Sequence, residues 1–584
     1  MTIEYQERAI DRHFAAFICR QASGEISDLF RLVVSLASSA VGKGNICLNL
    51  ADIEGETFFV DHKAILLPRL DVLTELVKSA SSVSFPGGPL CPLVLDDSGR
   101  LYLYRYWLYE QELGRILLQK AGTPFSNIDE FLLLDGLSRL FPASADHKSD
   151  RQKEAAVVAI HHQFCVISGG PGTGKTSTVV RILALLLEQD KSRKQRIAMA
   201  APTGKAAARL KTAINDIKNS LDCSDEIKLS IPDDVITIHR LLGTLPGSSR
   251  FRYSALNPLP FDTIIIDEAS MVALPLMSTL VSALKPSARL ILLGDRDQLA
   301  SVEAGSVLGD ICKAGTESPD SPLGSSLVML EKNYRFQAGS GIAEISRAVN
   351  AGLENEALML LQRSKSGTTW QKLPFREELP ASLAEEVVEG YQSYLDAASP
   401  REALERFDRF RILSALREGA YGVSGLNHTV ESILARKGII SQAGTFYRGR
   451  PVMITVNNYA MQLFNGDTGI LFPDPGNGGA LRAFFPAPDG GIRSIAPERL
   501  PLHETAFAIT IHKSQGSEFD RVLMILPPVD CEILTRELLY TGMTRAKKSF
   551  EIWANEDVFS AAVRKKTKRT SGFNFRVICV QENG

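Results

Sequence analysis

The stretch that decides the fold of this chain is Gly169-Gly170-Pro171-Gly172-Thr173-Gly174-Lys175-Thr176. It fits G-x-x-x-x-G-K-[ST], a loop whose backbone N–H groups cradle nucleotide phosphates. Lys175 can reach the β and γ oxygens, and the Thr176 hydroxyl suits Mg²⁺. Residues 164–168 predict a buried strand entering the loop, and residues 178–187 predict a helix whose N-terminus faces the anion. The stretch therefore predicts a nucleoside triphosphate site with Mg²⁺.

Length and composition limit the class of protein. With 584 residues, the chain is too long for one core, and we expect about three or four domains. No apolar run reaches the roughly 18 residues that span a bilayer, and the N-terminus lacks the pattern of a signal peptide. We therefore expect a cytoplasmic protein with no membrane partner. The cysteines form no C-x-x-C pair, which argues against a zinc or iron–sulfur site.

The net charge of −2 indicates no overall basic surface. It does not exclude a nucleic-acid partner, because such a partner is recognised by local charge.

The N-terminal part carries no chemical signature. We expect an N-terminal domain over residues 1–140, followed by a polar linker at 141–150. Within that domain, apolar periodicity predicts helices and one short strand. The helices are predicted over 25–40, 71–80 and 105–121, and the strand over 101–104.

Residues 151–330 alternate apolar strands with helices, which is typical of a parallel sheet covered on both faces. The strands are predicted at 164–168, 196–200, 263–266 and 289–293. A second α/β region is expected over 331–424 and 501–584. Between them, residues 425–500 carry short apolar runs separated by Gly, Asn and Pro turns, which predict a small inserted β-barrel.

Two acids end a predicted strand of the first α/β region. Asp267 is expected beside the Mg²⁺, through water, and Glu268 is suited to orient and deprotonate the attacking water. The alternative is a helix start at which acids are favoured by the helix dipole. Gln298 follows the next strand, where its amide could bind the γ-phosphate; the alternative is an ordinary polar turn.

Three further residues complete the predicted ATP site. The Gln152 amide could read both edges of adenine, although a surface glutamine is the alternative. Arg335 and Arg545 lie in the second α/β region. An ATPase whose site lies between two domains needs such cations on the far side to stabilise γ-phosphoryl charge. A lone arginine, by contrast, is usually a solvated or ion-paired surface residue.

In this order, the motifs resemble those of superfamily 1 helicases. They are Gln152, 169–176, 201–205, 237–239, Asp267-Glu268, 294–298, Arg335, 512–519 and 544–546. Five more segments resemble the RecD family of superfamily 1B, the alpha subunits of exodeoxyribonuclease V. They are 413–419, 422–427, 449–454, 463–469 and 536–541.

The resemblance implies a fold and a function. The fold comprises two RecA-like parallel-sheet motor domains, an SH3-like β-barrel inserted in the second, and a mainly helical N-terminal domain that docks a partner. The implied function is an ATP-dependent 5′→3′ DNA helicase in a RecBCD heterotrimer with beta and gamma (RecB-like and RecC-like) subunits, processing double-strand breaks. No segment has the pattern of a metal-dependent nuclease, so that site is expected in another subunit.

The resemblance also implies contacts to single-stranded and duplex-end DNA. The matching positions supply hydroxyl or cationic donors suited to phosphate oxygens. They are Thr203, Lys205, Thr237, His239, His512, Lys513 and Ser514. The alternative for these residues is local capping; Thr237, for example, could cap a following helix. The basic run 564–569 and a possible hairpin at 245–253 could also contact DNA, or the run could simply be solvated.

Three other functions are weighed against this one. An autonomous RecD-like 5′→3′ helicase would carry a longer N-terminal extension than the residues present here. An inactive scaffold subunit is disfavoured by the intact set of ATP-site residues. A small-molecule kinase does not account for the second α/β region and its motifs.

Overall fold

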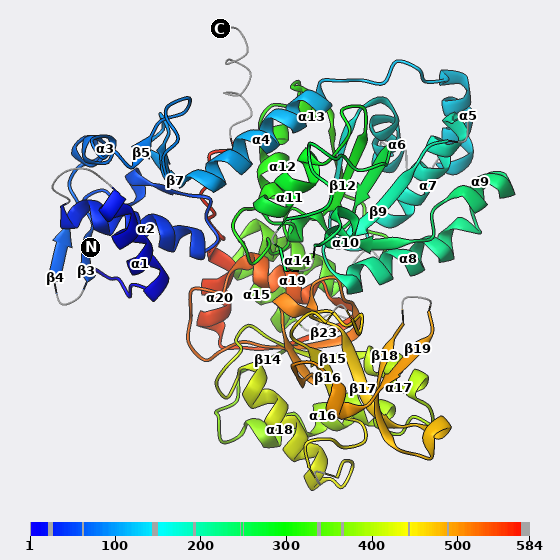
Figure 1. The fold of residues 1–584 in the computed structure, drawn as a ribbon. Coiled ribbons are helices and arrows are strands. Elements are labelled where there is room, and N and C mark those ends of the chain that lie inside the picture. The colour runs from blue at the N-terminus through cyan, green and yellow to red at the C-terminus, as the bar shows by residue number, and fades with distance from the viewer. Residues whose placement is uncertain are drawn as a thin grey trace.

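A computed structural model shows the chain as an N-terminal lobe beside two α/β domains (Figure 1). It describes residues 2–21, 27–60, 63–142, 150–190, 194–245, 247–248, 250–335, 340–363, 367–441, 444–458, 460–487 and 490–573. Most of the predicted linker 141–150 lies outside these residues. Across the described chain, no helix is both long enough and apolar enough to cross a membrane.

The first α/β domain is built on six parallel strands in the order β10-β9-β11-β12-β8-β13. The strands are β8 (Phe164–Gly169), β9 (Ile197–Ala201), β10 (Val235–Thr237), β11 (Thr263–Ile266), β12 (Arg289–Gly294) and β13 (Leu327–Leu330). Ile264 and Ile266 pack into one core and Ile265 into the other. Both faces of the sheet are therefore covered, which explains the continuous apolar runs and confirms the parallel-sheet prediction.

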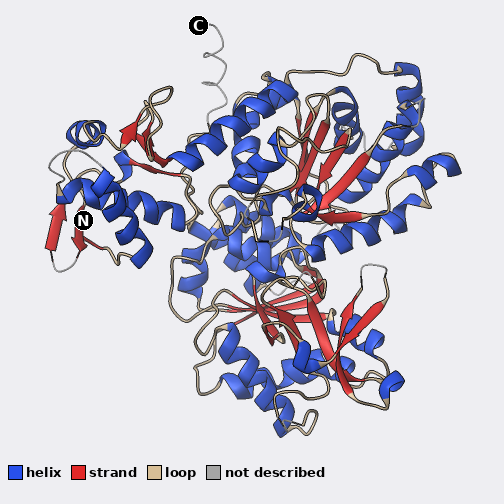
Figure 2. Cartoon of the chain, in the orientation of Figure 1, coloured by secondary structure: helices blue, strands red, loops and turns tan. Residues whose placement is uncertain are grey.

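Helices cover both faces of this sheet (Figure 2). They are α6 (Arg151–His161), α7 (Lys175–Gln189), α8 (Gly204–Lys218), α9 (Asp225–Ser230), α10 (Ile238–Leu242), α11 (Leu274–Ser282), α12 (Val307–Glu317) and α13 (Pro322–Ser325). Two earlier helices join them, α4 (Tyr104–Ala121) and α5 (Glu130–Leu140). Leu117 of α4 shares a core with β11 and β12, and Leu137 of α5 shares one with α7.

The packing of α4 and α5 bears on the predicted domain boundary at residue 140. That boundary followed the polar composition of the linker, whereas the apolar faces of both helices are buried on the first α/β domain. The boundary at residue 140 stays a prediction, and these contacts favour one nearer residue 103, before α4 begins.

The second α/β domain has five parallel strands in the order β14-β23-β22-β15-β21. They are β14 (Thr368–Gln371), β15 (Phe410–Ser414), β21 (Ala508–Thr510), β22 (Phe519–Ile525) and β23 (Ala546–Trp553). The helices are α14 (Gly341–Ala351), α15 (Glu354–Gln362), α16 (Leu379–Leu395), α17 (Pro400–Phe407), α18 (Val423–Arg436), α19 (Arg536–Met543) and α20 (Glu556–Arg564). The sheet again separates two apolar cores.

An antiparallel sheet interrupts the second domain between α18 and β21, where a small β-barrel was expected over 425–500; residues 425–436 of that range belong to α18, and β20 lies beyond its end. Its strands run in the order β19-β18-β17-β16-β20. They are β16 (Pro451–Ile454), β17 (Thr468–Pro473), β18 (Leu481–Pro486), β19 (Ile492–Ile495) and β20 (His503–Thr505). A small core containing Val452, Leu471 and Phe485 fills it. Closure of this sheet into an SH3-like barrel stays a prediction.

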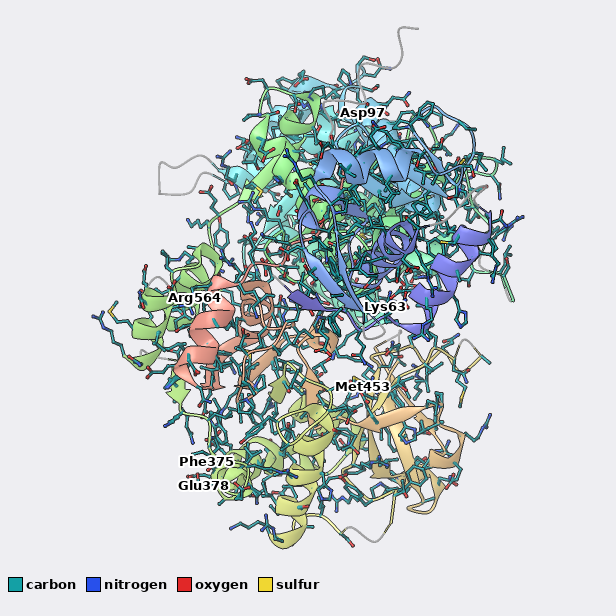
Figure 3. The ribbon with its side chains drawn as sticks, turned by 90° about the vertical axis from the view of Figure 1, so that its left-hand side faces the viewer. Lys63, Asp97, Phe375, Glu378, Met453 and Arg564 are labelled. Carbon is teal, nitrogen blue, oxygen red and sulfur yellow. The ribbon has the colours of Figure 1, made fainter. Side chains whose placement is uncertain are left out.

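The N-terminal lobe contains helices and two small sheets, and Figure 3 looks onto it, with Lys63 and Asp97 labelled. The helices are α1 (Ala9–Gln21), α2 (Asp28–Gly42) and α3 (Leu70–Lys78). The strands are β1 (Thr2–Glu4), β2 (Cys47–Asn49), β3 (Thr57–Val60), β4 (Lys63–Leu66), β5 (Val83–Ser84), β6 (Leu93–Leu95) and β7 (Arg100–Leu103). Only β7 was predicted, because strands this short carry too little periodicity to recognise.

Residues 565–573, here called the C-terminal strap, run from α20 back to the first domain and the N-terminal lobe (Figure 1, red). Arg569 donates to the carbonyls of Glu303 at 2.8 Å and Gly305 at 2.9 Å. The Thr570 amide donates to Asn45 Oδ1 at 2.8 Å, and the Gly572 amide to Glu110 Oε2 at 3.0 Å. Much of the basic run 564–569 is thus engaged within the chain.

Candidate active site

The phosphate loop lies between β8 and α7, where only glycine fits at two positions. Gly172 and Gly174 both have φ of +82°, in the left-handed region. A Cβ at Gly174 would lie 2.3 Å from Gln152 Nε2, and one at Gly172 would lie 2.4 Å from Arg335 Cβ. This tight backbone opens directly onto the N-terminus of α7, which is the geometry that binds phosphate.

Lys175 is folded onto its own loop. Its Nζ donates to the carbonyls of Gly169 at 2.5 Å and Gly170 at 3.1 Å. The Gln152 amide also binds the loop, donating to the Thr173 carbonyl at 3.1 Å, and its Oε1 accepts from Arg181 at 3.2 Å. Gln152 is buried, so it is not the surface glutamine that the sequence left open.

Two acids face the loop from the end of β11. Burial, followed by the charge of Glu268, raises the pKa of Asp267. Glu268 has φ of +51°, a region that non-glycine residues rarely adopt, and its amide donates to Asp267 Oδ1 at 2.9 Å. A strained residue held beside a buried acid is typical of a functional site.

Gln298 is buried next to an acid that the sequence analysis missed. Its Nε2 donates to Asp295 Oδ2 at 3.1 Å, while its Oε1 has no hydrogen-bond partner among the described residues. Tyr540 of the second domain donates to the same Asp295 oxygen at 2.9 Å. Asp295 directly follows β12, at the edge of the sheet where the phosphate loop lies. This position could have indicated a role for Asp295 in the site.

A cavity of about 190 Å³ unites these side chains between the two α/β domains. The predicted residues that line it are Pro171, Gly172, Gly174, Lys175, Thr176, Asp267, Glu268, Gln298, Arg335 and Arg545. Two residues to which the sequence analysis gave no role, Arg209 and Glu518, line it as well. A larger cavity of about 360 Å³ near Phe125 and Arg289 contains none of the predicted site residues.

Both predicted arginines reach the cavity from beyond β13. Arg335 pairs with Glu518, and its Nη1 is buried without a hydrogen bond to any described residue. Arg545 is buried and donates to the carbonyls of Thr541 at 3.1 Å and Ser517 at 3.2 Å. Burial lowers the pKa of the Arg545 guanidinium, and the charge of Glu268 opposes that shift.

The three predicted DNA-contact hydroxyls make local hydrogen bonds. Thr203 accepts from the Ala206 amide at 3.2 Å and caps α8, and Thr237 accepts from the Arg240 amide at 3.3 Å and caps α10. Ser514 is fully buried and donates to the Ile511 carbonyl at 2.7 Å. In this conformation, the Ser514 side chain is therefore placed to hold its own turn.

The predicted cations lie near the antiparallel sheet and the first domain. Lys205 Nζ lies 5.8 Å from the centre of the Phe519 ring, and burial lowers its pKa. Lys513 Nζ donates to Asn465 Oδ1 at 3.0 Å. His239 lies on α10, 5.9 Å from the Phe251 ring, and burial lowers the pKa of both His239 and His512.

Comparison with known families agrees with this architecture. Residues 152–304 match a model described as an AAA domain, and residues 505–550 match the UvrD-like helicase C-terminal domain. Residues 6–102 match the model of the N-terminal domain of RecBCD enzyme subunit RecD. RecBCD enzyme subunit RecD from Mycobacterium tuberculosis is 37% identical over 97% of this chain and 94% of its own length.

The chain belongs to the RecD family.

A second RecD subunit is a similarly complete match, whereas a RecD2 helicase is a partial one. The RecD subunit from Haemophilus influenzae is 33% identical, over 96% of each chain. The ATP-dependent RecD2 DNA helicase from Deinococcus radiodurans is 29% identical over 82% of this chain but only 59% of its own length. The alignment with RecD subunits thus extends over nearly the whole of both chains, whereas RecD2 has a large part with no counterpart here.

Proposed function

We propose that this RecD-family chain is the ATP-driven DNA motor subunit of a RecBCD-type helicase–nuclease that acts in double-strand break repair and recombination. One observation carries the proposal: a single cavity is lined by the phosphate loop and acids of the first α/β domain, by Arg335 just after the last strand of that domain, and by Arg545 of the second domain. Such a site changes when the domains move, and this couples hydrolysis to motion. The near-complete alignment with RecD subunits supports the subunit role over an autonomous helicase.

The residues of the cavity suit ATP and Mg²⁺. Lys175 and the loop amides would hold the phosphates, and Thr176 and Asp267 would hold the ion, Asp267 through water. Mg²⁺ would neutralise charge that develops on the phosphate oxygens. Gln152, which is buried against the loop, is suited to hold adenine.

The chain's own side chains carry the remaining steps. Glu268 orients the attacking water and takes its proton, and Gln298, with its free amide oxygen, senses the γ-phosphate. Arg335 and Arg545 stabilise the charge on the transferred group. Because Arg545 comes from the second domain, its engagement draws that domain onto the first.

The proposed DNA path runs beside the same domain boundary. Thr203, Lys205, Thr237, His239, His512, Lys513 and Ser514 remain the proposed contacts. Lys205 and Lys513 supply charge for phosphate oxygens, whereas the capped hydroxyls would act after a change of conformation. We propose 5′→3′ movement, and a nuclease site in another subunit.

The N-terminal lobe is the proposed docking site for the beta and gamma subunits. Ile10 and Phe17 lie seven residues apart on α1 and are 67% and 47% exposed, and Leu66 of β4 is 62% exposed. Exposed apolar side chains of this kind are typical of a protein interface.

The test is ATP hydrolysis and unwinding by the purified chain, on duplexes with a 5′ or a 3′ single-stranded tail. DNA-stimulated hydrolysis with unwinding from the 5′ tail supports the motor and its polarity. Hydrolysis without unwinding, restored by the beta and gamma subunits, supports the subunit role. Absence of hydrolysis in both settings would favour an inactive scaffold.

A further inference from the structure

One carboxylate and two guanidiniums form a bridge across the domain boundary. Arg209 lies on α8 of the first domain, Arg335 follows β13, and Glu518 precedes β22 of the second domain. The same Glu518 oxygen, Oε1, pairs with Nη2 of Arg209 and with Nη2 of Arg335. The side chains of Glu518 and Arg335 are 15% and 19% exposed, whereas that of Arg209 is 40% exposed, so the bridge is shielded from solvent mainly on its Arg335 side.

The backbone around Arg335 is fixed on the phosphate loop. The Tyr334 amide donates to the Gly172 carbonyl at 2.7 Å, and Asn333 Nδ2 donates to the Pro171 carbonyl at 2.7 Å. The guanidinium lies at the far end of a flexible side chain, where Glu518 is its ion-pair partner among the described residues. The direction of the guanidinium therefore depends on Glu518.

The arrangement of charges in the bridge depends on all three side chains, Arg209, Arg335 and Glu518. Burial alone would raise the pKa of Glu518, but Arg209 and Arg335 outweigh burial and lower it, so the carboxylate stays ionised. Without Glu518, two guanidiniums would face each other beside the third, Arg545, and repulsion would drive them apart. Without Arg209, Glu518 would lose its anchor on the first domain.

The bridge also joins two segments that are proposed to contact DNA. Helix α8, which carries Arg209, begins directly after Thr203. Glu518 follows the turn His512–Ser514 on a short, mostly buried stretch. A shift in either segment would move one end of the bridge and so turn Arg335.

We propose that Arg209 and Glu518 are positioning residues for Arg335. Glu518, anchored on the first domain by Arg209, holds the Arg335 guanidinium beside the phosphate loop in the direction that ATP hydrolysis needs. The inference rests on the proposed ATPase function of the cavity.

The experiment compares Glu518→Gln, Arg209→Ala and Arg209→Lys in the full chain, with partner subunits where activity requires them. Steady-state hydrolysis gives kcat and KM, and a fluorescent non-hydrolysable ATP analogue gives Kd. We expect Glu518→Gln to lower kcat at least about 10-fold while Kd changes less than about 3-fold, because the variant loses the orientation of the Arg335 guanidinium but keeps nucleotide binding. Arg209→Ala should act in the same direction, and Arg209→Lys should recover part of the loss.

A double-mutant cycle supplies the specific readout. In an Arg335→Ala background, Glu518→Gln should lower kcat by no more than about 2-fold further, because the residue that it positions is gone. Glu405→Gln and Arg436→Ala, at exposed positions on α17 and α18, are the matched controls and should change nothing.

Two results would overturn the inference. If Glu518→Gln raises Kd more than about 10-fold at constant kcat, the carboxylate contacts the nucleotide itself. If its loss adds fully to that of Arg335→Ala, the two residues act independently. Lys175→Ala separates the failure of this inference from the failure of the ATPase proposal. Undiminished hydrolysis in that variant would contradict the proposed ATP site itself. Circular dichroism checks that each variant folds. If Glu518→Gln misfolds, the inference is tested with Arg209→Lys instead.

Discussion

At the scale of residues, the chemistry of the cavity was predictable where the type of a residue and its neighbours in sequence indicate its role. Lys175 and Asp267 follow recognisable strands, and the structure brings them into one cavity. Arg209 and Glu518 were not predictable, because their role is a pairing between residues 309 positions apart. An arginine on a helix surface looks the same in sequence whether or not a distant carboxylate meets it.

Lys175→Ala should abolish ATP hydrolysis and leave assembly with the partner subunits intact. The ammonium is the cation of the phosphate loop itself, and it donates only within that loop, to the carbonyls of Gly169 and Gly170, so we expect its removal to affect the nucleotide site and not the assembly. Hydrolysis assays and co-purification test this, with the exposed Lys437→Ala as control. Unchanged turnover would contradict the site.

Arg545→Ala should leave ATP binding within about 3-fold and lower hydrolysis by about 10³-fold or more, as expected of an arginine finger. Arg545 also donates to two backbone carbonyls, so Arg545→Lys is measured alongside it to separate charge from support. An equal loss of nucleotide affinity in Arg545→Ala would indicate a structural role instead.

At the scale of elements, strands that are apolar throughout were mostly predictable, whereas most of the shortest strands were not. The four strands predicted in the first domain all exist, because each is buried on both faces and therefore apolar throughout. The missed strands, β10, β13 and most of those in the N-terminal lobe, contain two to four residues each, a length at which recognition is unreliable: β7 and β11, of four residues each, were predicted. The packing of α4 and α5 on the first domain was not predictable, because helix amphipathicity does not say which neighbour covers the apolar face.

Ile265→Ala in β11 should lower the free energy of unfolding by about 2–4 kcal/mol, because it leaves a cavity between the sheet and the helices that cover that face. Ile265 is fully buried, whereas Ile10 is 67% exposed. Denaturant unfolding of both alanine variants makes the comparison, and an equal effect at the two positions would contradict the packing described here.

At the scale of the whole molecule, the C-terminal strap joins the first domain and the N-terminal lobe, which the composition of the chain does not connect. Glu110 of α4 is buried under it, where Oε2 accepts from the Gly572 amide and Oε1 accepts from the Tyr102 hydroxyl at 3.2 Å. Burial raises the pKa of Glu110 to about 7 from 4.5. No sequence pattern marks this junction, since it forms only when residues near both ends of the chain meet.

The raised pKa predicts a pH dependence of stability. Between about pH 4.5 and 7, folded Glu110 retains a proton that the unfolded chain releases, so the free energy of unfolding should fall as pH rises through this window. The fall attributable to Glu110 is on the order of 1–3 kcal/mol. Unfolding measured across the window should show a flatter profile for Glu110→Gln, and identical profiles for the two proteins would contradict the assignment.

The position of the strap in the chain also sets an order of events during synthesis. Residues 565–573 leave the ribosome after every element that they fasten. At roughly 5–20 residues per second, the N-terminal lobe is complete on the order of half a minute or more before Thr570 arrives to bind Asn45. A partner subunit that docks on the lobe can therefore bind the nascent chain before the C-terminal strap has joined the motor domains to the lobe.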